Sequence, residues 1–476
     1  MAPSMHTWDD DTNLFAHSVI GYAIERLRLA KDTHWGAHPA EELADALAHA
    51  ITPNGVGGLE ALHLFRDVLM PACRPMDDPM NLAYVPTAPS IASTMFDLVV
   101  SASSIFGGNW EAGAGAIAAE NQALRWLADL AGFPTTAGGV FVSGGSAANL
   151  SALVTARDVF TTSRGGRPER FTVAVTDEVH ASVRAAARVM DVNVLAVPVD
   201  ANGRMTGAAL EAALAAHGVD DVFAVVATAG TTNAGVIDEL DKIADVCSAR
   251  KLWMHVDGAY GLAALCSDIA RHRFNGIERA DSFGVDPHKW LFAPYDCAAL
   301  VYRDPIPAAA AHAQHGAYLD AVNRGDWNPS DYAYHLSRRA RGLPLWFGLA
   351  TYGTQAYTDA VDGAINTARA FADEVAARPE FHLLQEPELS IVLFTRDGWT
   401  RDQYLEWSKR RAGEGQFLIV PTSWHDDSCL RICVVHPRTD PAALSVLLDD
   451  LATYIPASAD RLGVSTTAIG EIADAH

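Results

Sequence analysis

The sequence predicts an α/β protein with a mostly parallel seven-stranded sheet and a smaller C-terminal α+β lobe. Between residues 138 and 304, apolar runs alternate with amphipathic helical segments, which is typical of a parallel sheet covered on both faces. After about residue 377 the order becomes strand, helix, two strands and helix, which predicts a separate lobe. A chain of 476 residues is long enough for two or three such lobes.

Seven apolar runs bounded by turn residues are the expected strands of the large sheet. They cover Gly139–Val142, Phe171–Val175, Val192–Val199, Val222–Ala227, Leu252–Val256, Ser282–Val285 and Ala298–Tyr302. The helices between them are expected to begin near Ala147, His180, Thr206 and Asp238. The small lobe is expected to contain strands Ser390–Thr395, Gln416–Pro421 and Leu430–Val435, and helices Arg401–Arg411 and Pro441–Tyr454.

The segments outside the sheet complete the expected domain organisation. Apolar residues recur with helical spacing from Asp11 to about Ala30 and from Pro39 to Ala50, which predicts an N-terminal arm that packs on a partner subunit. The segment from Ile306 to Arg341 shows no clear period and predicts a long exposed loop, a kind of segment that is often functional. We therefore divide the chain into a helical arm (1–80), a large α/β domain (81–360), a small α+β domain (361–460) and a tail (461–476).

Composition narrows the function classes. The formal net charge is −23, which argues against nucleic acid or an anionic membrane as the main partner, because both attract basic surfaces. The chain contains no apolar run of about 18 residues, and its start lacks the basic and apolar regions of a signal peptide, so we expect a cytoplasmic protein. The six cysteines show no metal-ligand spacing and are expected to be reduced thiols, with no metal site.

The stretch Asp281-Ser-Phe-Gly-Val-Asp-Pro-His-Lys-Trp290 is read as a short strand that ends in a turn presenting Lys289. Pro287 blocks continuation of the strand ladder, and the apolar residues from Trp290 onward are expected to wall the lysine. Desolvation disfavours an ammonium group, so such a lysine would have more free amine for Schiff-base formation. By itself, the tetrapeptide Asp286-Pro-His-Lys289 is better interpreted as carrying an ordinary surface cation.

A second stretch, Leu252-Trp-Met-His-Val-Asp-Gly-Ala-Tyr-Gly261, delivers Asp257 to the carboxyl end of a strand, where ligands of α/β sheets bind. A carboxylate that faces a pyridinium nitrogen keeps a pyridoxal ring protonated. Asp257 could equally be a turn-initiating residue before glycine. Its pairing with Lys289 favours the cofactor interpretation.

Three further strand ends carry polar residues. Ser143-Gly-Gly-Ser146 turns into a helix, and helix N–H groups beside glycines suit a phosphate. This motif matches neither the dinucleotide nor the nucleoside triphosphate fingerprint. His180 follows a strand and could stack on a flat ring or simply start a helix. Thr231 or Thr232, at another strand end, could hydrogen-bond a cofactor.

Taken together, these motifs resemble the group II pyridoxal-phosphate-dependent amino-acid decarboxylases, which include the aromatic-L-amino-acid, histidine and glutamate decarboxylases. The resemblance runs from about Tyr84 to Arg438. It implies the fold of the pyridoxal phosphate (PLP)-dependent transferases, which is aspartate-aminotransferase-like and of fold type I. It also implies PLP as the cofactor, an amino-acid substrate, and a homodimer with shared active sites.

The resemblance also implies individual roles. Lys289 would carry the Schiff base, His180 would stack on the ring, and Asp257 would pair with the pyridine nitrogen. The remaining cofactor-binding residues would be Gly144, Gly145, Ser146, Thr232, Ala259 and His288.

In family decarboxylases, a mobile-loop tyrosine protonates the carbanionic intermediate, and relatives that form aldehydes replace this tyrosine or the stacking histidine. Tyr332, which follows Asp331, resembles the family tyrosine and is our expected fourth catalytic residue. Its distance to Arg338-Arg339 is shorter than in the family pattern, so Tyr334 is a second candidate and Tyr318 a weaker one. Because His180 is retained, the resemblance favours decarboxylation.

The expected substrate is an aromatic L-amino acid, because the segments that resemble the family's substrate pocket are apolar and aromatic. These segments are Tyr84–Thr87 and Ile105–Trp110. The second would reach across from the partner subunit. The pocket residues are Tyr84, Pro86, Thr87, Phe106 and Trp110.

Four alternatives remain open. The substrate could be a large aliphatic amino acid, or the enzyme could form an aldehyde. An aminotransferase is a third possibility, in which Arg431 would grip the substrate carboxylate. A zinc site through His255, Asp257 and His288 is the fourth, but the sequence offers no matching ligand spacing for it.

Overall fold

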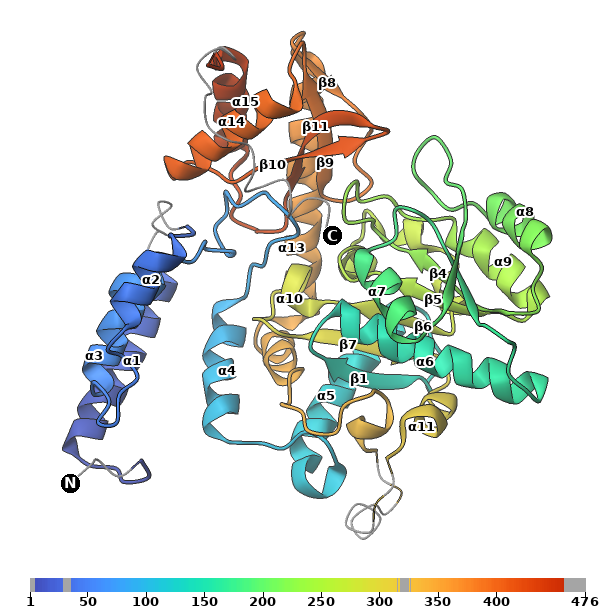
Figure 1. Cartoon of the computed structure of the whole chain (residues 1–476), viewed down its shortest axis with the longest axis horizontal. Helices are drawn as coiled ribbons and strands as arrows, with labels where there is room; N and C mark the ends of the chain where they lie inside the picture. The colour runs from blue at the N-terminus through green and yellow to red at the C-terminus, as the bar shows by residue number, and fades with distance from the viewer. Residues whose placement is uncertain (1–4, 29–35, 315, 317–324, 326, 458–476) are drawn as a thin grey trace.

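The computed structural model describes all residues except 1–4, 29–35, 315, 317–324, 326 and 458–476. Figure 1 shows a large α/β body, a smaller lobe above it and a group of N-terminal helices beside it. The expected tail therefore lies outside the described residues, as does the weaker tyrosine candidate, Tyr318. The expected domain boundaries remain a prediction. Helix α13 (Leu343–Ala377) spans the boundary expected at residue 360.

The large sheet has seven strands in the order β1-β7-β6-β5-β4-β2-β3. Strand β7 runs antiparallel to its neighbours β1 and β6, and the remaining neighbours are parallel. The predicted fold class is confirmed, and each predicted strand lies within a few residues of an observed one. The strands are β1 (Gly138–Val142), β2 (Thr172–Val175), β3 (Asn193–Ala196), β4 (Val222–Thr228), β5 (Trp253–Asp257), β6 (Ser282–Val285) and β7 (Ala298–Tyr302).

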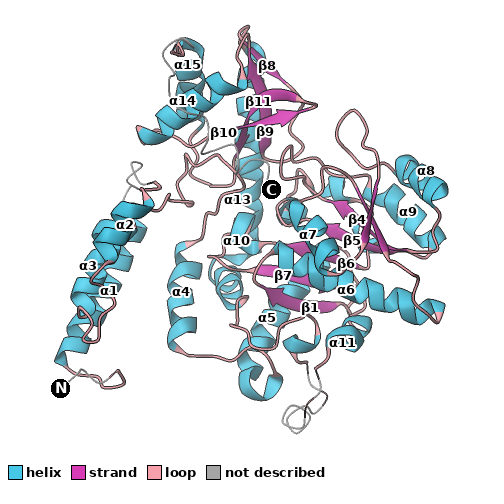
Figure 2. Ribbon diagram, viewed as in Figure 1, coloured by secondary structure: helices cyan, strands magenta, loops and turns pink. Residues whose placement is uncertain are grey.

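Helices cover both faces of this sheet because its strands are apolar on both sides (Figure 2). In β1, Val140 and Val142 join one buried cluster while Phe141 joins the other, as the period of two requires. The first cluster includes residues of α6 (Gly145–Arg164), α7 (Ala181–Val189) and α11 (Ile306–His312). The second includes residues of α5 (Trp110–Leu130), α8 (Gly207–His217), α9 (Leu240–Arg250) and α13.

The small lobe is an antiparallel sheet in the order β10-β11-β9-β8, packed with helices α14 and α15. The expected strand Gln416–Pro421 is shifted, because its first half pairs with another segment: the Leu418 backbone accepts from Leu82 at 2.9 Å and donates to Met80 at 3.0 Å. Strand β8 has three residues and was not predicted. The elements are β8 (Phe381–Leu383), β9 (Ile391–Arg396), β10 (Val420–Trp424), β11 (Asp427–Cys433), α14 (Arg401–Gly413) and α15 (Pro441–Thr453).

The N-terminal helices α1 (Asp10–Arg28), α2 (Ala40–Leu47) and α3 (Gly58–Leu64) stand apart from the body (Figure 1). The described residues of these helices include no buried side chain. Large apolar side chains on α1, such as Leu14, Ile20 and Ile24, are exposed. The arm therefore has an apolar surface that its own chain leaves uncovered.

The prediction of a long exposed loop over 306–341 is wrong for the described residues. The segment contains α11 and a 3₁₀ turn, Pro329–Asp331, and several of its side chains are buried. Arg338 is held by a buried ion pair, in which its two terminal nitrogens each lie 2.8 Å from a carboxylate oxygen of Glu120 on α5. A buried guanidinium needs such a partner, and the pair fixes this segment against the body.

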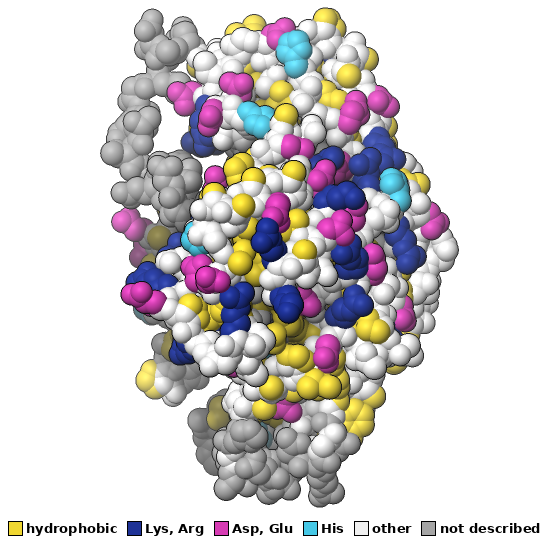
Figure 3. Space-filling view, turned by 90° about the vertical axis from the view of Figure 1, so that its right-hand side faces the viewer, with side chains coloured by type: hydrophobic (Ala, Val, Ile, Leu, Met, Phe, Trp, Pro, Cys, Tyr) yellow, Lys and Arg dark blue, Asp and Glu magenta, His cyan; other side chains and the backbone are white. Residues whose placement is uncertain are grey.

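The side of the body that carries α8 and α9 shows charges of both signs. In Figure 3, Lys and Arg side chains are interspersed with Asp and Glu over this face. Arg279 pairs with Asp245 at 2.7 Å, and Arg250 pairs with Glu211. Within the described ranges, no helix is both long enough and apolar enough to cross a bilayer.

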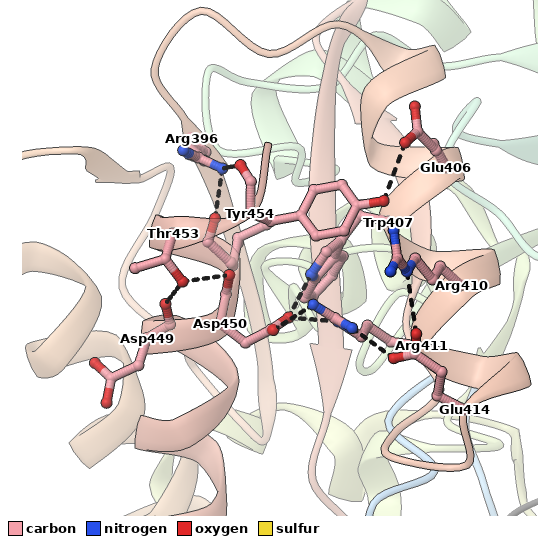
Figure 4. Close-up of polar contacts among 11 residues, drawn as sticks. Arg396, Glu406, Trp407, Arg410, Arg411, Glu414, Asp449, Asp450, Thr453 and Tyr454 are labelled. Atoms are coloured by element: carbon pink, nitrogen blue, oxygen red, sulfur yellow. Dashed lines mark hydrogen bonds and ion pairs between the residues drawn. The ribbon is translucent and has the colours of Figure 1, made fainter. Parts of the chain in front are cut away.

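Asp450 on α15 joins the two helices of the small lobe (Figure 4). Its Oδ2 accepts hydrogen bonds from Trp407 Nε1 at 2.7 Å and Arg411 Nε at 2.8 Å, and its Oδ1 accepts from Arg411 Nη2 at 2.6 Å. Trp407 is fully buried on α14. One carboxylate thus satisfies the only polar atom of a core indole and a guanidinium.

We expect Asp450→Ala to lower the free energy of unfolding by about 2–3 kcal/mol, because it leaves the Trp407 N–H without its acceptor. Asp449→Ala is the matched control on the same helix: its carboxylate pairs with Arg378 but is 68% exposed, so the cost should stay below about 1 kcal/mol. Urea denaturation of both variants measures the difference. Equal losses would contradict the anchoring role of Asp450.

Candidate active site

The carboxyl ends of parallel strands meet at one edge of the large sheet, and most of the residues singled out from the sequence follow these ends. Gly144 follows β1, His180 follows β2 and Thr232 follows β4. Asp257 ends β5, and Lys289 lies in the turn after β6. The fold therefore brings five motifs that are far apart in the sequence to one place.

Lys289 lies in the short helix α10 (Pro287–Trp290), with its Nζ 3.1 Å from Oδ2 of the buried Asp286. Burial acts to lower the pKa of Lys289, but the carboxylates of Asp286 and Asp257 outweigh it, so the pKa is raised. The expectation that desolvation would leave more free amine is therefore wrong for the chain by itself. The two neighbouring carboxylates hold Lys289 as an ammonium.

The apolar residues after Lys289 pack into the main core, and their expected role as a wall around the amine stays a prediction. Trp290, Leu291 and Phe292 are buried in the main core, and the Trp290 ring stacks on Tyr260 with 5.2 Å between centroids. These residues anchor the turn that carries Lys289 to the main core, because a large buried indole holds the chain on both sides of it.

Asp257 is nearly fully buried, and both of its oxygens are hydrogen-bonded. Oδ2 accepts from Asn149 Nδ2 at 2.8 Å, and Oδ1 accepts from the Ala259 backbone at 3.1 Å. Asn149 lies on α6, where its Oδ1 is 2.9 Å from Nε2 of the fully buried His255. Because the other ring nitrogen of His255 contacts Ser282 at 2.8 Å, both nitrogens are engaged, which disfavours the zinc alternative.

His180 is the N-cap residue of α7. Its Nδ1 accepts a hydrogen bond from the backbone N–H of Ser182 at 3.2 Å and lies 2.8 Å from the Ser182 hydroxyl. The same hydroxyl is 3.0 Å from Asn149 Nδ2. The exposed His180 ring is thus tied through Ser182 to the residue that holds Asp257.

The start of α6 has the features of a phosphate site. No side chain caps the helix at Gly144, and a Cβ added to Gly144 would meet open space. A Cβ at Gly145 would lie only 3.1 Å from Ala259 Cβ and 3.3 Å from Asp286 Oδ2. Glycine therefore gives a ligand room at one position and allows close packing at the next, beside the positive end of a 20-residue helix. The exposed hydroxyl-bearing residue Ser146 follows.

The ring of His288, the residue before Lys289, is directed towards Cys297. Its Nδ1 lies 2.8 Å from the Cys297 carbonyl, and its Nε2 is 3.7 Å from Asp286 Oδ2. Burial lowers the pKa of His288, against the opposing effect of Asp286. The ring thus lies near Asp286, whose Oδ2 is also close to Gly145 at the start of α6.

Arg431 lies in β11 and donates to three backbone carbonyls: Asn233 at 3.0 Å, Tyr84 at 2.5 Å and Thr232 at 2.6 Å. Its guanidinium is therefore occupied in joining the small lobe to two loops at the site. Tyr84, held through its carbonyl, is 60% exposed and has φ +56°, an uncommon backbone conformation for such a residue. Pro86 and Thr87 are buried behind it.

The two candidate threonines differ in their surroundings. Thr231 is buried, and its hydroxyl accepts a hydrogen bond from the Val236 backbone at 3.1 Å. Thr232 is exposed, and its contact with Arg431 uses its carbonyl oxygen and not its hydroxyl.

Three of the expected site residues, Phe106, Trp110 and Tyr332, are not beside Lys289 in this chain. They gather at the opposite end of β1, where Tyr332 stacks on Trp327 with 4.0 Å between centroids and Trp327 lies against Gly138. The six residues from Gly138 to the cradle at Gly144 span roughly 20 Å of extended chain.

Hydrogen bonds tie these segments together. The Trp110 backbone donates to Asn328 Oδ1 at 3.0 Å, and the Ser330 backbone donates to the Gly108 carbonyl at 3.1 Å. The second pocket segment and the segment that carries Tyr332 therefore pack together at the end of β1 opposite to the start of α6.

The two described loop tyrosines differ in exposure. Tyr332 is 9% exposed within a core cluster, and burial raises its pKa to about 12. Tyr334 is 55% exposed and touches the chain through an edge contact with His335. Of the two side chains, only that of Tyr334 is largely exposed.

Three site residues were not singled out from the sequence: Asn149, Ser182 and Asp286. One signal was available for Asn149, since this polar amide shares a helix face with the apolar Ala152 and Leu153. Asp286 was read only as part of its motif. Its partnership with Lys289 depends on the turn geometry, which the sequence does not reveal.

Comparison with known proteins gives consistent results. A family model described as the pyridoxal-dependent decarboxylase conserved domain matches residues 59–396. The chain is 29% identical to an aromatic-L-amino-acid decarboxylase of Bacillus atrophaeus over 95% of this chain and 97% of the relative. It is 31% identical to the Cavia porcellus aromatic-L-amino-acid decarboxylase over 78% of this chain and 82% of the relative. The crystal structure of Oryza sativa TDC with PLP and tryptamine has a TM-score of 0.87 at 24% identity, covering 94% of this chain and 98% of that one.

We expect the stability of the protein to fall in acid because of His255, whose burial lowers its pKa from 6.5 to about 4. Between these pH values, His255 is protonated in the unfolded chain but stays neutral in the folded chain. Stability is therefore lost as the pH falls from about 6.5 towards 4.

His255→Gln should show a shallower pH dependence than the wild type when urea denaturation is compared at pH about 7.5 and about 4.5. Substitution of the exposed His272 by glutamine is the control and should leave the dependence unchanged. A parallel shift of both variants would contradict the assignment to His255.

Proposed function

Because the chain belongs to the pyridoxal-dependent decarboxylase family and is a PLP-dependent carboxy-lyase acting on an amino acid, we propose that its substrate is an aromatic L-amino acid. The products would be the corresponding aromatic amine and carbon dioxide. The observation that carries the proposal is the convergence of Lys289, Asp257, His180 and the α6 start on one sheet edge. The relatives described as aromatic-L-amino-acid decarboxylases support the substrate class.

The residues at this edge fit PLP, as the open space at Gly144 and the uncapped α6 start indicate. When bound, PLP supplies an electron sink for the electron pair left behind by departing carbon dioxide. We propose that Gly144, Gly145, Ser146 and His288 hold its phosphate. Lys289 would be its covalent attachment point, with Thr232 and Ala259 beside the ring.

Asp257 and Asp286 would have different roles towards the cofactor. Asp257, buried and hydrogen-bonded on both oxygens, would keep a proton on the pyridine nitrogen, because a desolvated carboxylate interacts strongly with a nearby cation. Asp286 would receive Lys289 as an ammonium when the substrate amine takes its place. His180 would stack on the ring.

The contacts of Arg431 favour decarboxylation over amino transfer. An aminotransferase would need a free guanidinium to grip the substrate carboxylate, whereas Arg431 donates to three backbone carbonyls. A carboxylate without such a clamp is freer to leave. The exposed Tyr84, whose carbonyl Arg431 holds, supports an aromatic side-chain pocket; a large aliphatic side chain remains the alternative.

We further propose a homodimer with shared active sites. This is supported by the joint surface of Phe106, Trp110 and the loop tyrosines, which lies away from the Lys289 of the same chain. The exposed apolar side chains of α1 give a second surface that a partner could cover. In such a dimer, each loop would serve the site of the partner.

The exposure of the tyrosines bears on which of them donates the proton. Tyr332 was the first candidate from the sequence, but its ring stacks on Trp327 and the residue is largely buried in a core cluster. We therefore propose Tyr334 as the donor, with Tyr332 as the alternative. If neither donates, the aldehyde-forming reaction becomes the better proposal.

We expect purified, PLP-loaded protein incubated with a pool of L-amino acids to yield an aromatic amine lighter than its parent by carbon dioxide, detected by mass spectrometry. Lys289→Ala is the matched control and should lose both the amine and the visible absorbance of covalently bound cofactor. An aliphatic amine would correct the substrate class. Aldehydes or keto acids without amine would overturn the proposed reaction.

We expect Tyr334→Phe to lower amine formation by roughly 10²- to 10⁴-fold and to shift the products toward the aldehyde, because it removes the proton donor. Tyr332→Phe keeps the stacked ring and should change amine formation by less than about threefold. Product ratios by mass spectrometry distinguish the two. The reverse pattern would return the donor role to Tyr332.

A further inference from the structure

Asn149 lies at the junction of two hydrogen-bond chains under the candidate site. It is 1% exposed on α6, one turn after the uncapped helix start. Its Nδ2 is 2.8 Å from Asp257 Oδ2 and 3.0 Å from the Ser182 hydroxyl, and its Oδ1 is 2.9 Å from His255 Nε2. All the hydrogen-bonding groups of this buried amide are thus directed at side chains of other elements.

The direction of the first chain is fixed by the chemistry of its ends. An ionised Asp257 only accepts hydrogen bonds, so the amide must present Nδ2 to it and Oδ1 to His255. His255 must then carry its proton on Nε2. Burial lowers the pKa of His255 to about 4, so the ring is neutral near pH 7 and its Nδ1 accepts from the Ser282 hydroxyl. That hydroxyl in turn accepts from Trp253 Nε1, which only donates, at 3.0 Å.

The second chain runs from Asn149 to His180. The second Nδ2 hydrogen points at the Ser182 oxygen, which directs the Ser182 proton towards His180 Nδ1. The Ser182 backbone N–H also donates to this nitrogen. His180 Nδ1 is therefore an acceptor, and the neutral ring carries its proton on Nε2, the nitrogen farther from the α7 start.

We propose that Asn149 is a positioning residue that orients the Asp257 carboxylate and the His180 ring as one unit, with His255 and Ser282 fixing the direction of the amide. This inference rests on the proposed cofactor contacts of Asp257 and His180. Asn149 itself touches neither substrate nor reacting atoms.

The arrangement has a chemical consequence for Asp257. A charged histidine in the place of Asn149 would neutralise the carboxylate, whereas a neutral amide orients it and leaves its charge intact. With Asn149 on Oδ2 and the Ala259 N–H on Oδ1, each oxygen keeps a lone pair for a cationic ring nitrogen. A neutral His255 behind the amide preserves this charge, because it adds no positive charge of its own.

The test is the dissociation constant of PLP, measured by absorbance titration of the apoprotein without substrate. Asn149→Ala should weaken PLP binding roughly 10- to 100-fold, because the hydrogen bond to a charged partner is lost. Asn149→Asp should bind weakly at pH about 8, where two carboxylates face each other. It should recover to within about threefold of wild type at pH about 6, where a shared proton restores the donor. This recovery is a signature that a merely structural role for Asn149 would not produce.

Ser151→Ala is the matched control on the same helix. Ser151 is fully buried, and none of the described residues partners its hydroxyl, so PLP affinity should stay within about twofold of wild type. Ser282→Ala, which breaks the chain at its far end, should weaken binding by about three- to tenfold and serves if Asn149→Ala does not fold. Circular dichroism melting confirms that each compared variant is folded.

Folded Asn149→Ala with wild-type PLP affinity would overturn the proposal, as would Asn149→Asp with equal affinity at both pH values. These titrations contain no amino acid. A wild-type enzyme that forms products other than an aromatic amine would therefore contradict the proposed function and leave the role of Asn149 intact.

Discussion

A carboxylate buried at the end of a central strand must be hydrogen-bonded, and this requirement at Asp257 organises the candidate site. Asn149 and the Ala259 backbone satisfy its two oxygens. Through Asn149, the same carboxylate is coupled to a helix start, to His255 in its own strand and, by way of Ser182, to the exposed His180 ring. The rigidity of the site thus derives from a polar network inside an apolar sheet, in which each member limits the orientation of the next.

Charge outweighs burial at Lys289. An apolar pocket would have favoured the free amine, but the structure surrounds the lysine with Asp286 and Asp257, and the pKa is raised. Within the described chain, Arg431, unlike Lys289, is not paired with a carboxylate at the site. Its guanidinium donates to backbone carbonyls and holds the loop at Tyr84.

The buried pair of Arg338 and Glu120 organises the other end of the sheet. Glu120 also accepts from the Gly342 backbone at 2.8 Å, and Arg338 donates to the Gly107 carbonyl at 2.6 Å. These contacts hold the segment before α13 against the one that bears Phe106. The surface proposed to complete a neighbouring site is therefore built on one ion pair, and removing either partner would leave the other charge buried.

The sequence by itself determined the sheet, because runs of apolar residues flanked by glycine and proline have few other ways to bury both faces. It also determined which motifs would meet, since parallel strands place their carboxyl ends at one edge. It could not reveal the partners of Asn149, which lie on segments far apart in sequence, or the ion pair of Asp286 with Lys289, which depends on the geometry of the turn. Nor could it show that residues 327–341 pack against the large α/β body. That outcome depends on Arg338 finding a buried carboxylate 218 positions earlier, a pairing that only the tertiary structure decides.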